Sequence, residues 1–336
     1  MTRFSYRAGG LLLALTIAAS VALAQEGPTF RTQSNVVLVP ALVRDKAGNI
    51  VYGLHAGDFL VEDDGVAQSI RLDEAAVDNP VSLVVAVQCG RRANFELPRM
   101  RSLASMLQPV IDQPNSKIAL VSFDSHVHAR VSFTSNADEI RQSLRNLQPG
   151  DGGAAILDAV SYSVKLLAGV PKDHKRVLLL ISETRDHGSK RATVDDVIEA
   201  IGNSNTVVYT LAFSPSKSNA LDTLKGNNNW DLHRDTTEVH MDPDLLAPFL
   251  MAAQAMRKNT ARAIATQSGG EYEMFASGKG FEARLNDFSN HLHSRYLLSF
   301  QPSRPMPGLH LLEVRLQQPG TNTVLARSSY WAQGSQ

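Results

Sequence analysis

The stretch Ser82-Leu-Val-Val-Ala-Val-Gln-Cys-Gly-Arg91 is the strongest indicator of the fold. Its apolar run from Leu83 to Val87 is rich in β-branched residues and is too short for a helix. Such a run predicts a strand of a parallel sheet that is buried on both faces. A helix-like pattern follows the run. Because ligands of open α/β sheets bind just beyond the carboxyl ends of such strands, we expect a site in the loop from Val87 to Arg92.

Further apolar runs alternate with segments of helical spacing along the middle of the chain. The predicted strands are Lys117–Phe123, Arg176–Ser182 and Thr206–Phe213, and the predicted helices include Phe95–Ile111 and Ala154–Ala168. Thr193-Val-Asp-Asp196 resembles a capping box that opens another helix. This alternation predicts an α/β fold with a doubly wound, mostly parallel sheet.

The two ends of the chain have a different pattern, dominated by short strands. Between residues 35 and 76 we expect about four strands, with a hairpin turn at Asp63-Asp64-Gly65. Residues 36–43 form either one strand or two strands broken near Pro40. Further short strands are predicted within residues 295–332. Because neither end can bury much apolar surface alone, we expect the two to pair into a small accessory β unit, a β-sandwich beside the α/β domain.

The first 24 residues have the features of a secretory signal peptide. Two arginines lie within the first seven residues, an apolar run extends from Leu11 to Ala22, and Ala22-Leu23-Ala24 is a suitable cleavage site. A membrane anchor is the alternative, but the apolar run is shorter than the roughly 20 residues of a bilayer span. We therefore expect an exported protein, periplasmic or secreted, with no membrane span after cleavage.

The expected organisation has five parts. They are the signal peptide at 1–24, a flexible segment at 25–34, the N-terminal β unit at 35–76, the α/β domain at 79–294 and the C-terminal strands at 295–332. Residues 214–241 are polar and predict a long excursion within the α/β domain. Lys+Arg and Asp+Glu both number 33, so the chain lacks the basic balance of a nucleic-acid-binding protein.

Several segments, in their order along the chain, resemble one family. Val39–Phe59 followed by Glu62-Asp-Asp-Gly65, Ala261–Gly270 and Arg295–Pro302 resemble the VWFA-related family of acidobacteria, and residues 81–300 resemble a von Willebrand factor type A domain. The resemblance implies a Rossmann-like fold and a metal-ion-dependent adhesion site. In that site, an Asp-x-Ser-x-Ser loop, a Thr and an Asp hold Mg²⁺, whose coordination a ligand carboxylate completes.

This sequence departs from the family's metal site at every position. The first loop supplies Val87, Cys89 and Arg91, the second supplies Ala154, and the third supplies Glu183 in place of Asp. Val and Ala have no ligand atom, and Mg²⁺ prefers oxygen to the sulfur of Cys. We therefore expect that the Mg²⁺ of the family is lost and that the protein has no cofactor. Either Arg91 or Arg92 could replace the cation and pair with Glu183 or Asp186; alternatively, these arginines are simply solvated.

Other candidate sites have weaker support. His126-Val-His128 and His291-Leu-His293 could contribute to zinc sites, but neither has an obvious carboxylate or Cys partner nearby, so exposed histidines are expected. Acidic residues around Asp63 and Asp64 do not match an EF-hand loop, so a solvated hairpin tip is expected. The single cysteine, Cys89, is interpreted as a small buried hydrophobe.

These observations favour a non-enzymatic, exported module that binds another protein. We expect a ligand-binding rim that includes Gln88, Arg91, Arg92, Asp151, Glu183 and Asp186. The alternative is a structural envelope scaffold with a vestigial site. An exported hydrolase ranks last, because no Gly-x-Ser-x-Gly elbow follows a strand. The sequence does not indicate the oligomeric state.

Overall fold

The computed structural model describes residues 36–73, 79–94, 96–213, 247–304, 306–318 and 320–332. The predicted signal peptide, the flexible segment at 25–34 and the excursion at 214–241 lie outside the described residues. The described residues all belong to one unit, residues 35–336.

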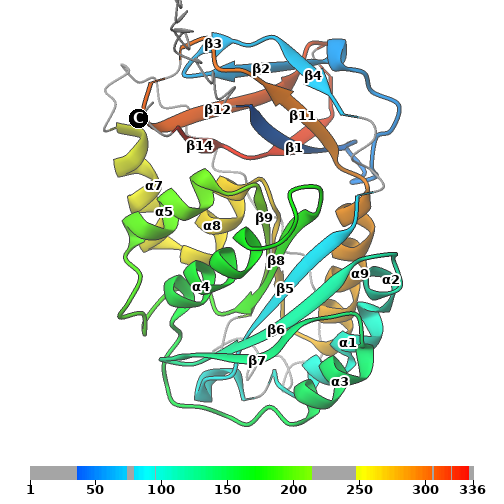
Figure 1. Ribbon diagram of the computed structural model, residues 1–336, viewed down its shortest axis with the longest axis vertical. Helices are drawn as coiled ribbons and strands as arrows, with labels where there is room; N and C mark the ends of the chain where they lie inside the picture. The colour runs from blue at the N-terminus through cyan, green and yellow to red at the C-terminus, as the bar shows by residue number, and fades with distance from the viewer. Residues whose placement is uncertain are drawn as a thin grey trace, which may run out of the picture. The chain divides into compact units, whose positions relative to one another are not determined.

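A six-stranded sheet forms the centre of the α/β domain, with the order β10-β9-β8-β5-β6-β7 (Figure 1). Its strands are β5 (Val81–Gln88), β6 (Lys117–Phe123), β7 (Val127–Thr134), β8 (Lys175–Ser182), β9 (Thr206–Phe213) and β10 (Tyr272–Phe275). All neighbouring strands are parallel except β7, which runs antiparallel to β6. The doubly wound, mostly parallel sheet that the sequence predicts is thus confirmed.

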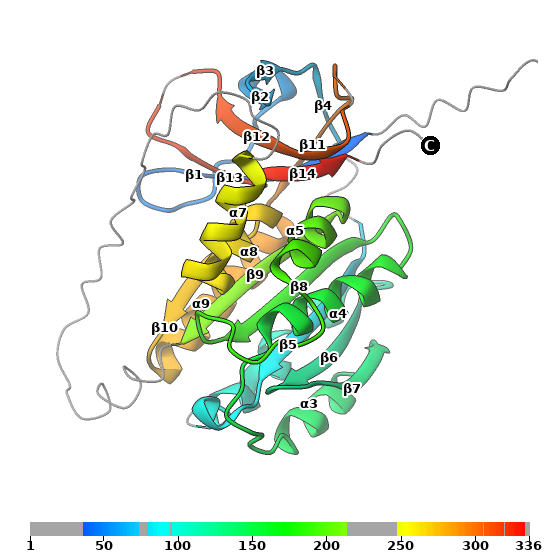
Figure 2. The same cartoon turned by 90° about the vertical axis from the view of Figure 1, so that its left-hand side faces the viewer.

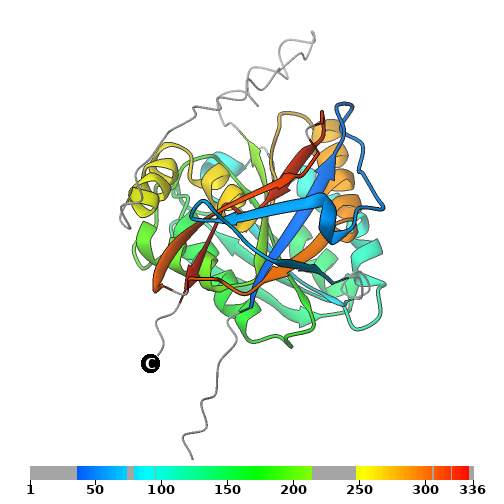
Figure 3. The same cartoon turned by 90° about the horizontal axis from the view of Figure 1, so that it is seen from above.

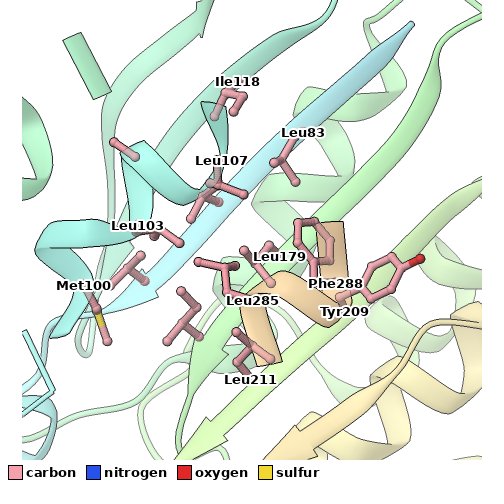
Figure 4. Close-up of a cluster of buried hydrophobic side chains, with 14 of the residues drawn as sticks. Leu83, Met100, Leu103, Leu107, Ile118, Leu179, Tyr209, Leu211, Leu285 and Phe288 are labelled. Atoms are coloured by element: carbon pink, nitrogen blue, oxygen red, sulfur yellow. The ribbon is translucent and has the colours of Figure 1, made fainter. Parts of the chain in front are cut away.

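Helices cover both faces of this sheet (Figure 2). The helices are α1 (Leu103–Met106), α2 (Gln108–Ile111), α3 (Ala137–Arg145), α4 (Ile156–Ala168), α5 (Val194–Asn203), α7 (Ala247–Lys258), α8 (Thr260–Ser268) and α9 (Gly278–His293). Short 3₁₀ turns are η1 (Ala56–Asp58), η3 (Arg91–Ala93) and η4 (Arg99–Ser102). Alternate residues of β5 enter two different cores. Leu83 lies with α1 and α9 (Figure 4), and Val84 lies with α4 and α5. Burial on both faces explains why the sequence of β5 is apolar without alternation.

The helix predicted over Phe95–Ile111 is wrong as a single element. The structure instead has the 3₁₀ turn η4 followed by the two short helices α1 and α2. Pro109 lies in the first turn of α2, where its missing N–H does no harm. A proline at this position cannot continue a helix that begins upstream, so the chain restarts the helix instead.

The accessory β unit consists of two four-stranded sheets, β13-β1-β11-β4 and β14-β12-β2-β3. The strands are β1 (Val37–Arg44), β2 (Phe59–Asp63), β3 (Val66–Ala67), β4 (Ile70–Leu72), β11 (Tyr296–Phe300), β12 (Gly308–Leu316), β13 (Thr323–Ala326) and β14 (Ser329–Ala332). Both sheets therefore combine strands from the two ends of the sequence, and blue strands lie beside orange and red ones in Figure 3. One apolar core that includes Val39, Val61 and Phe300 joins the two sheets. The accessory unit expected from the sequence is confirmed.

Strand β1 is continuous, so of the two alternatives near Pro40 the single strand is the one observed. Pro40 pairs with Leu297 of β11, whereas β13 pairs only with Ala41–Arg44. Pro40 thus lies where one edge of β1 has no neighbouring strand in the sheet. A proline is compatible with a strand at such a place, because no ladder hydrogen bond is lost.

Buried polar contacts connect the α/β domain with the accessory strands. Glu271 lies 3.2 Å from Arg295, 3.3 Å from Arg44 and 2.8 Å from His291, measured between the carboxylate oxygens and the nearest side-chain nitrogens. Arg327, fully buried before β14, donates to the carbonyl oxygens of residues 201 and 202 at the end of α5. The sequence predicts that His291 is exposed; this is wrong, because Glu271 pairs with it in the interior. Among the described helices, none has the length and apolarity required to cross a bilayer.

Candidate functional site

The candidate site lies where β5, β6 and β8 end and the loops after them meet. Val87, Cys89 and Ala154 occupy three of the positions where the resemblance implies metal ligands, and all three are buried. None of these side chains carries an oxygen, and burial raises the pKa of the Cys89 thiol above its usual value. A hard cation that requires oxygen ligands therefore does not fit this set of residues.

The fourth position holds Glu183, whose carboxylate is engaged by protein groups. Gln88 donates through Nε2 to Oε1 at 2.8 Å, and the Nε2 atom of His187 lies 2.6 Å from the same oxygen. Arg92 places Nη1 3.6 Å from Oε2. In return, the backbone N–H of Glu183 donates to the amide oxygen of Gln88. The network satisfies a buried carboxylate that would otherwise be costly.

The environment of this network differs between its base and its surface. The Glu183 side chain is 8% exposed and that of Arg92 is 59% exposed. Gln88 is fully buried, so its amide acts by orienting Glu183 and does not reach the surface. Arg91 and Asp151 are exposed beside Arg92. A cationic group thus covers a buried anionic group at the end of the sheet.

Two aspartates hold the third loop, which follows β8, against helix α4 by hydrogen bonds. Asp186 accepts hydrogen bonds from the backbone N–H of Leu157 and from the hydroxyl of Ser189, so it holds the first turn of α4. Asp158, on α4, accepts from three successive backbone N–H groups at residues 190–192. Asp186 was expected in the rim, but its Oδ1 is committed to these structural contacts. The sequence analysis missed Asp158, because an acceptor of backbone N–H groups leaves no spacing signal.

The turn between β6 and β7 and the second loop together hold a carboxylate cluster that the sequence analysis missed. Asp124, His126 and Asp151 each offer a ligand atom, and these atoms lie within 4.8 Å of one another. Asp124 already accepts from the backbone N–H groups of His126 and Asp151, and Asp151 accepts from Ser125. The view that His126 and His128 lack a carboxylate partner is wrong, since Asp124 lies 4.0 Å and 3.5 Å from them. The cluster braces the loop with its own hydrogen bonds.

Close packing constrains a glycine in the first loop and one in the second. A Cβ atom on Gly153 would lie 2.6 Å from Cβ of Ser125, and one on Gly90 would lie 2.4 Å from the carbonyl oxygen of Gly153. These glycines let the first and second loops touch through their backbones. The geometry of the site therefore depends on backbone contact as well as on side chains.

The arrangement does not present a hydrolytic nucleophile among the described residues at the ends of β5 and β8. Ser182 is fully buried, and its hydroxyl donates to the carbonyl oxygen of Glu183 at 2.8 Å. His187 is directed to the Glu183 carboxylate. Catalysis by a serine nucleophile needs its hydroxyl within reach of a general base and of a substrate.

This chain is similar in sequence to proteins that are already known. Residues 90–186 match the sequence profile of the von Willebrand factor type A domain. A stretch of 132 residues, 38% of this chain, is 24% identical to the mouse (Mus musculus) protein "Calcium-activated chloride channel regulator 3A-1", of which it spans 14%.

Similar solved structures include a conserved hypothetical protein, BatB, from Bacteroides thetaiotaomicron and the vWF domain of the type V pili tip protein Mfa5 from Porphyromonas gingivalis. BatB is 14% identical, with 63% of this chain and 98% of that one covered and a TM-score of 0.41. The Mfa5 domain is 11% identical, with coverages of 64% and 95% and a TM-score of 0.41. Over residues 90–186 the chain thus matches the von Willebrand factor type A domain, and the doubly wound, mostly parallel sheet agrees with that match.

Proposed function

We propose that this protein is an exported, non-enzymatic module that binds another protein at the end of its central sheet without a bridging metal ion. The observation that carries the proposal is that protein side chains occupy the carboxylate of Glu183. Its buried carboxylate is paired with Arg92 and His187, at the place where the family holds a cation. A cation there would have to displace these contacts.

The charge of the exposed groups indicates the chemistry of the partner. Arg91, Arg92 and Arg185 are exposed around Glu183, and Lys190 and Arg191 follow in the third loop. In the metal-bridged mode of the family, a carboxylate of the partner meets a positive charge. Here guanidinium groups supply that charge directly, and they bind carboxylates through paired hydrogen bonds. We therefore propose an acidic segment of a protein as the ligand.

The test is a selection of peptides from a displayed random library, carried out in parallel with Mg²⁺ and with chelator. We expect enrichment of peptides rich in Asp and Glu under both conditions. An Arg91→Ala/Arg92→Ala double variant should lose most of this binding, measured by fluorescence anisotropy of a selected peptide. Arg71→Ala serves as the matched control, because Arg71 is an exposed arginine on β4 of the accessory unit.

Two results would contradict the proposal. Enrichment that requires Mg²⁺ and disappears in Glu183→Ala would show a metal-bridged site. Failure to enrich any peptide, with a stable fold, would favour a structural scaffold with a vestigial site.

A further inference from the structure

The second place of interest is the turn between β2 and β3 in the accessory unit. Strand β2 alternates between buried and half-buried residues, and Asp63 falls on the buried face with Phe59 and Val61. Asp63 is 4% exposed, so the expectation of a solvated hairpin tip is wrong for this residue. An aspartate on the inward face of a strand needs a specific partner, because burial of an unpaired carboxylate is costly.

Three metal-ligating side chains meet at this turn. The Nδ1 atom of His310, on β12, lies 3.2 Å from Oδ1 of Asp63 and 2.8 Å from Oδ2 of Asp64. The three ligand atoms all lie within 4.8 Å of one another. Strands β2 and β12 pair with each other, so segments far apart in the sequence deliver these groups to one point.

Each of the three side chains is held in place by its other polar atom. Nε2 of His310 lies 2.7 Å from the carbonyl oxygen of Met306, to which it must donate. The hydroxyl of Tyr330 donates to Oδ2 of Asp63, and the backbone N–H of Leu311 donates to Oδ1 of Asp64. This is the second layer of contacts that orients metal ligands in proteins, with the free nitrogen or oxygen of each ligand turned inward.

The inward atoms face each other without a hydrogen bond of good geometry. Nδ1 of His310 and Oδ1 of Asp63 are both buried and unsatisfied by that criterion, although Nδ1 lies 2.8 Å from Oδ2 of Asp64. The imidazole side chain is 5% exposed and that of Asp63 is 4% exposed. Because Nε2 donates to Met306, Nδ1 of a neutral imidazole would be an acceptor that faces two carboxylate oxygens, so a third participant, a proton or a cation, must lie between these atoms.

Charge points to a divalent cation as that participant. Within the part of the chain that the structure describes, neither Asp63 nor Asp64 forms an ion pair with Lys or Arg. A proton on His310 leaves one negative charge on the three groups, whereas a divalent ion with a neutral imidazole leaves none. One imidazole nitrogen with two carboxylate oxygens suits Zn²⁺ and similar transition ions better than Ca²⁺ or Mg²⁺.

We propose that Asp63, Asp64 and His310 bind a divalent transition-metal ion of the Zn²⁺ class, which ties the β2–β3 turn to β12. The Asp64 side chain is 36% exposed, so this side of the site is open to an entering ion and to a water ligand. The ion would stabilise the pairing of the two ends of the chain. The proposal is independent of the rim described above.

The experiment is calorimetric titration of the chelator-treated protein with Zn²⁺, Mn²⁺, Ca²⁺ and Mg²⁺. We expect one Zn²⁺ per chain and much weaker binding of Ca²⁺ and Mg²⁺. Asp64→Asn is the main variant, because Asp64 has a φ of 49° and asparagine tolerates this left-handed backbone. It should weaken Zn²⁺ binding more than about tenfold while the midpoint of thermal unfolding in chelator stays near the wild-type value.

His310→Gln is the second variant and should abolish Zn²⁺ binding. Asp151→Asn and Glu183→Ala are the matched controls, because they alter the carboxylates at the end of the central sheet, and both should bind Zn²⁺ as the wild type does. Zn²⁺ should also raise the midpoint of thermal unfolding in the wild type but not in Asp64→Asn. The proposal is overturned if the wild type takes up no Zn²⁺, if Asp64→Asn binds it unchanged, or if only Asp151→Asn loses it.

Discussion

Replacement of Glu271 by alanine tests how the α/β domain and the accessory strands are held together. The Glu271 side chain is 7% exposed and Arg295 is 8% exposed, so the variant leaves a buried guanidinium without its carboxylate. Loss of one partner of a buried ion pair costs about 3–5 kcal/mol. Arg295 retains two other acceptors, the hydroxyl of Tyr209 and the carbonyl oxygen of Gly269, so we expect the lower end, about 3 kcal/mol.

Glu62→Ala provides the matched control. Glu62 also pairs with an arginine, Arg315, at 2.7 Å, but that arginine side chain is 52% exposed. Pairs of this kind contribute less than about 1 kcal/mol, because water screens them. Urea denaturation followed by circular dichroism gives both free energies of unfolding by linear extrapolation. Equal losses for the two variants would refute the reasoning, since burial would then make no difference.

The remaining predictions concern pH, packing and reactivity. Burial acts to raise the pKa of Glu271, but a hydrogen bond from His291 and the charges of two arginines lower this pKa overall. The stabilisation by Glu271 is therefore present above the unfolded pKa near 4.5 and is lost as the pH falls through the folded pKa. Glu271→Gln should reduce this loss of stability at acid pH, measured by urea denaturation at a series of pH values. Gly270→Ala should destabilise by about 3 kcal/mol in thermal unfolding, because its Cβ would lie 1.9 Å from a backbone oxygen of β9, whereas Gly278→Ala, in open space, should be near neutral. Cys89 is 1% exposed and should react with a thiol reagent only in urea, so rapid labelling of the native protein would contradict its burial. Leu179→Ala in the central core should cost about 2–5 kcal/mol, and a smaller loss by the same assay would mean that the core collapses around the cavity.

The strands of the central sheet could be predicted closely from the sequence. Strands β6 and β9 have the predicted bounds, and β8 begins one residue earlier than expected. Burial on both faces makes such strands visible as short, continuous apolar runs. The broken helix after β5 could not be predicted, because helical spacing of apolar residues continues across Pro109 even though the backbone cannot.

The candidate site could be predicted only in outline. The loops at the strand ends and the position of Glu183 follow from the sequence, but the contacts of Asp124 and Asp158 do not, because they bind backbone N–H groups of distant segments. For Asp63 the sequence does contain a signal of burial. Phe59, Val61 and Asp63 alternate with period two, which places the aspartate on the inward face of β2.

The buried acidic groups also explain why the rim would select an anionic partner. Glu271 is balanced by arginines inside the protein, and Glu183 is paired with Arg92 and accepts contacts from Gln88 and His187. The Glu183 carboxylate is contacted by Gln88 on the buried side and by Arg92 on the solvent side, so it presents little negative charge to the surface. The exposed arginines of the first and third loops then dominate the local field, since exposed charges act over about 8–10 Å at physiological ionic strength. A partner with clustered carboxylates gains from this field, whereas a basic partner would be repelled, so the proposed binding should weaken as the salt concentration rises.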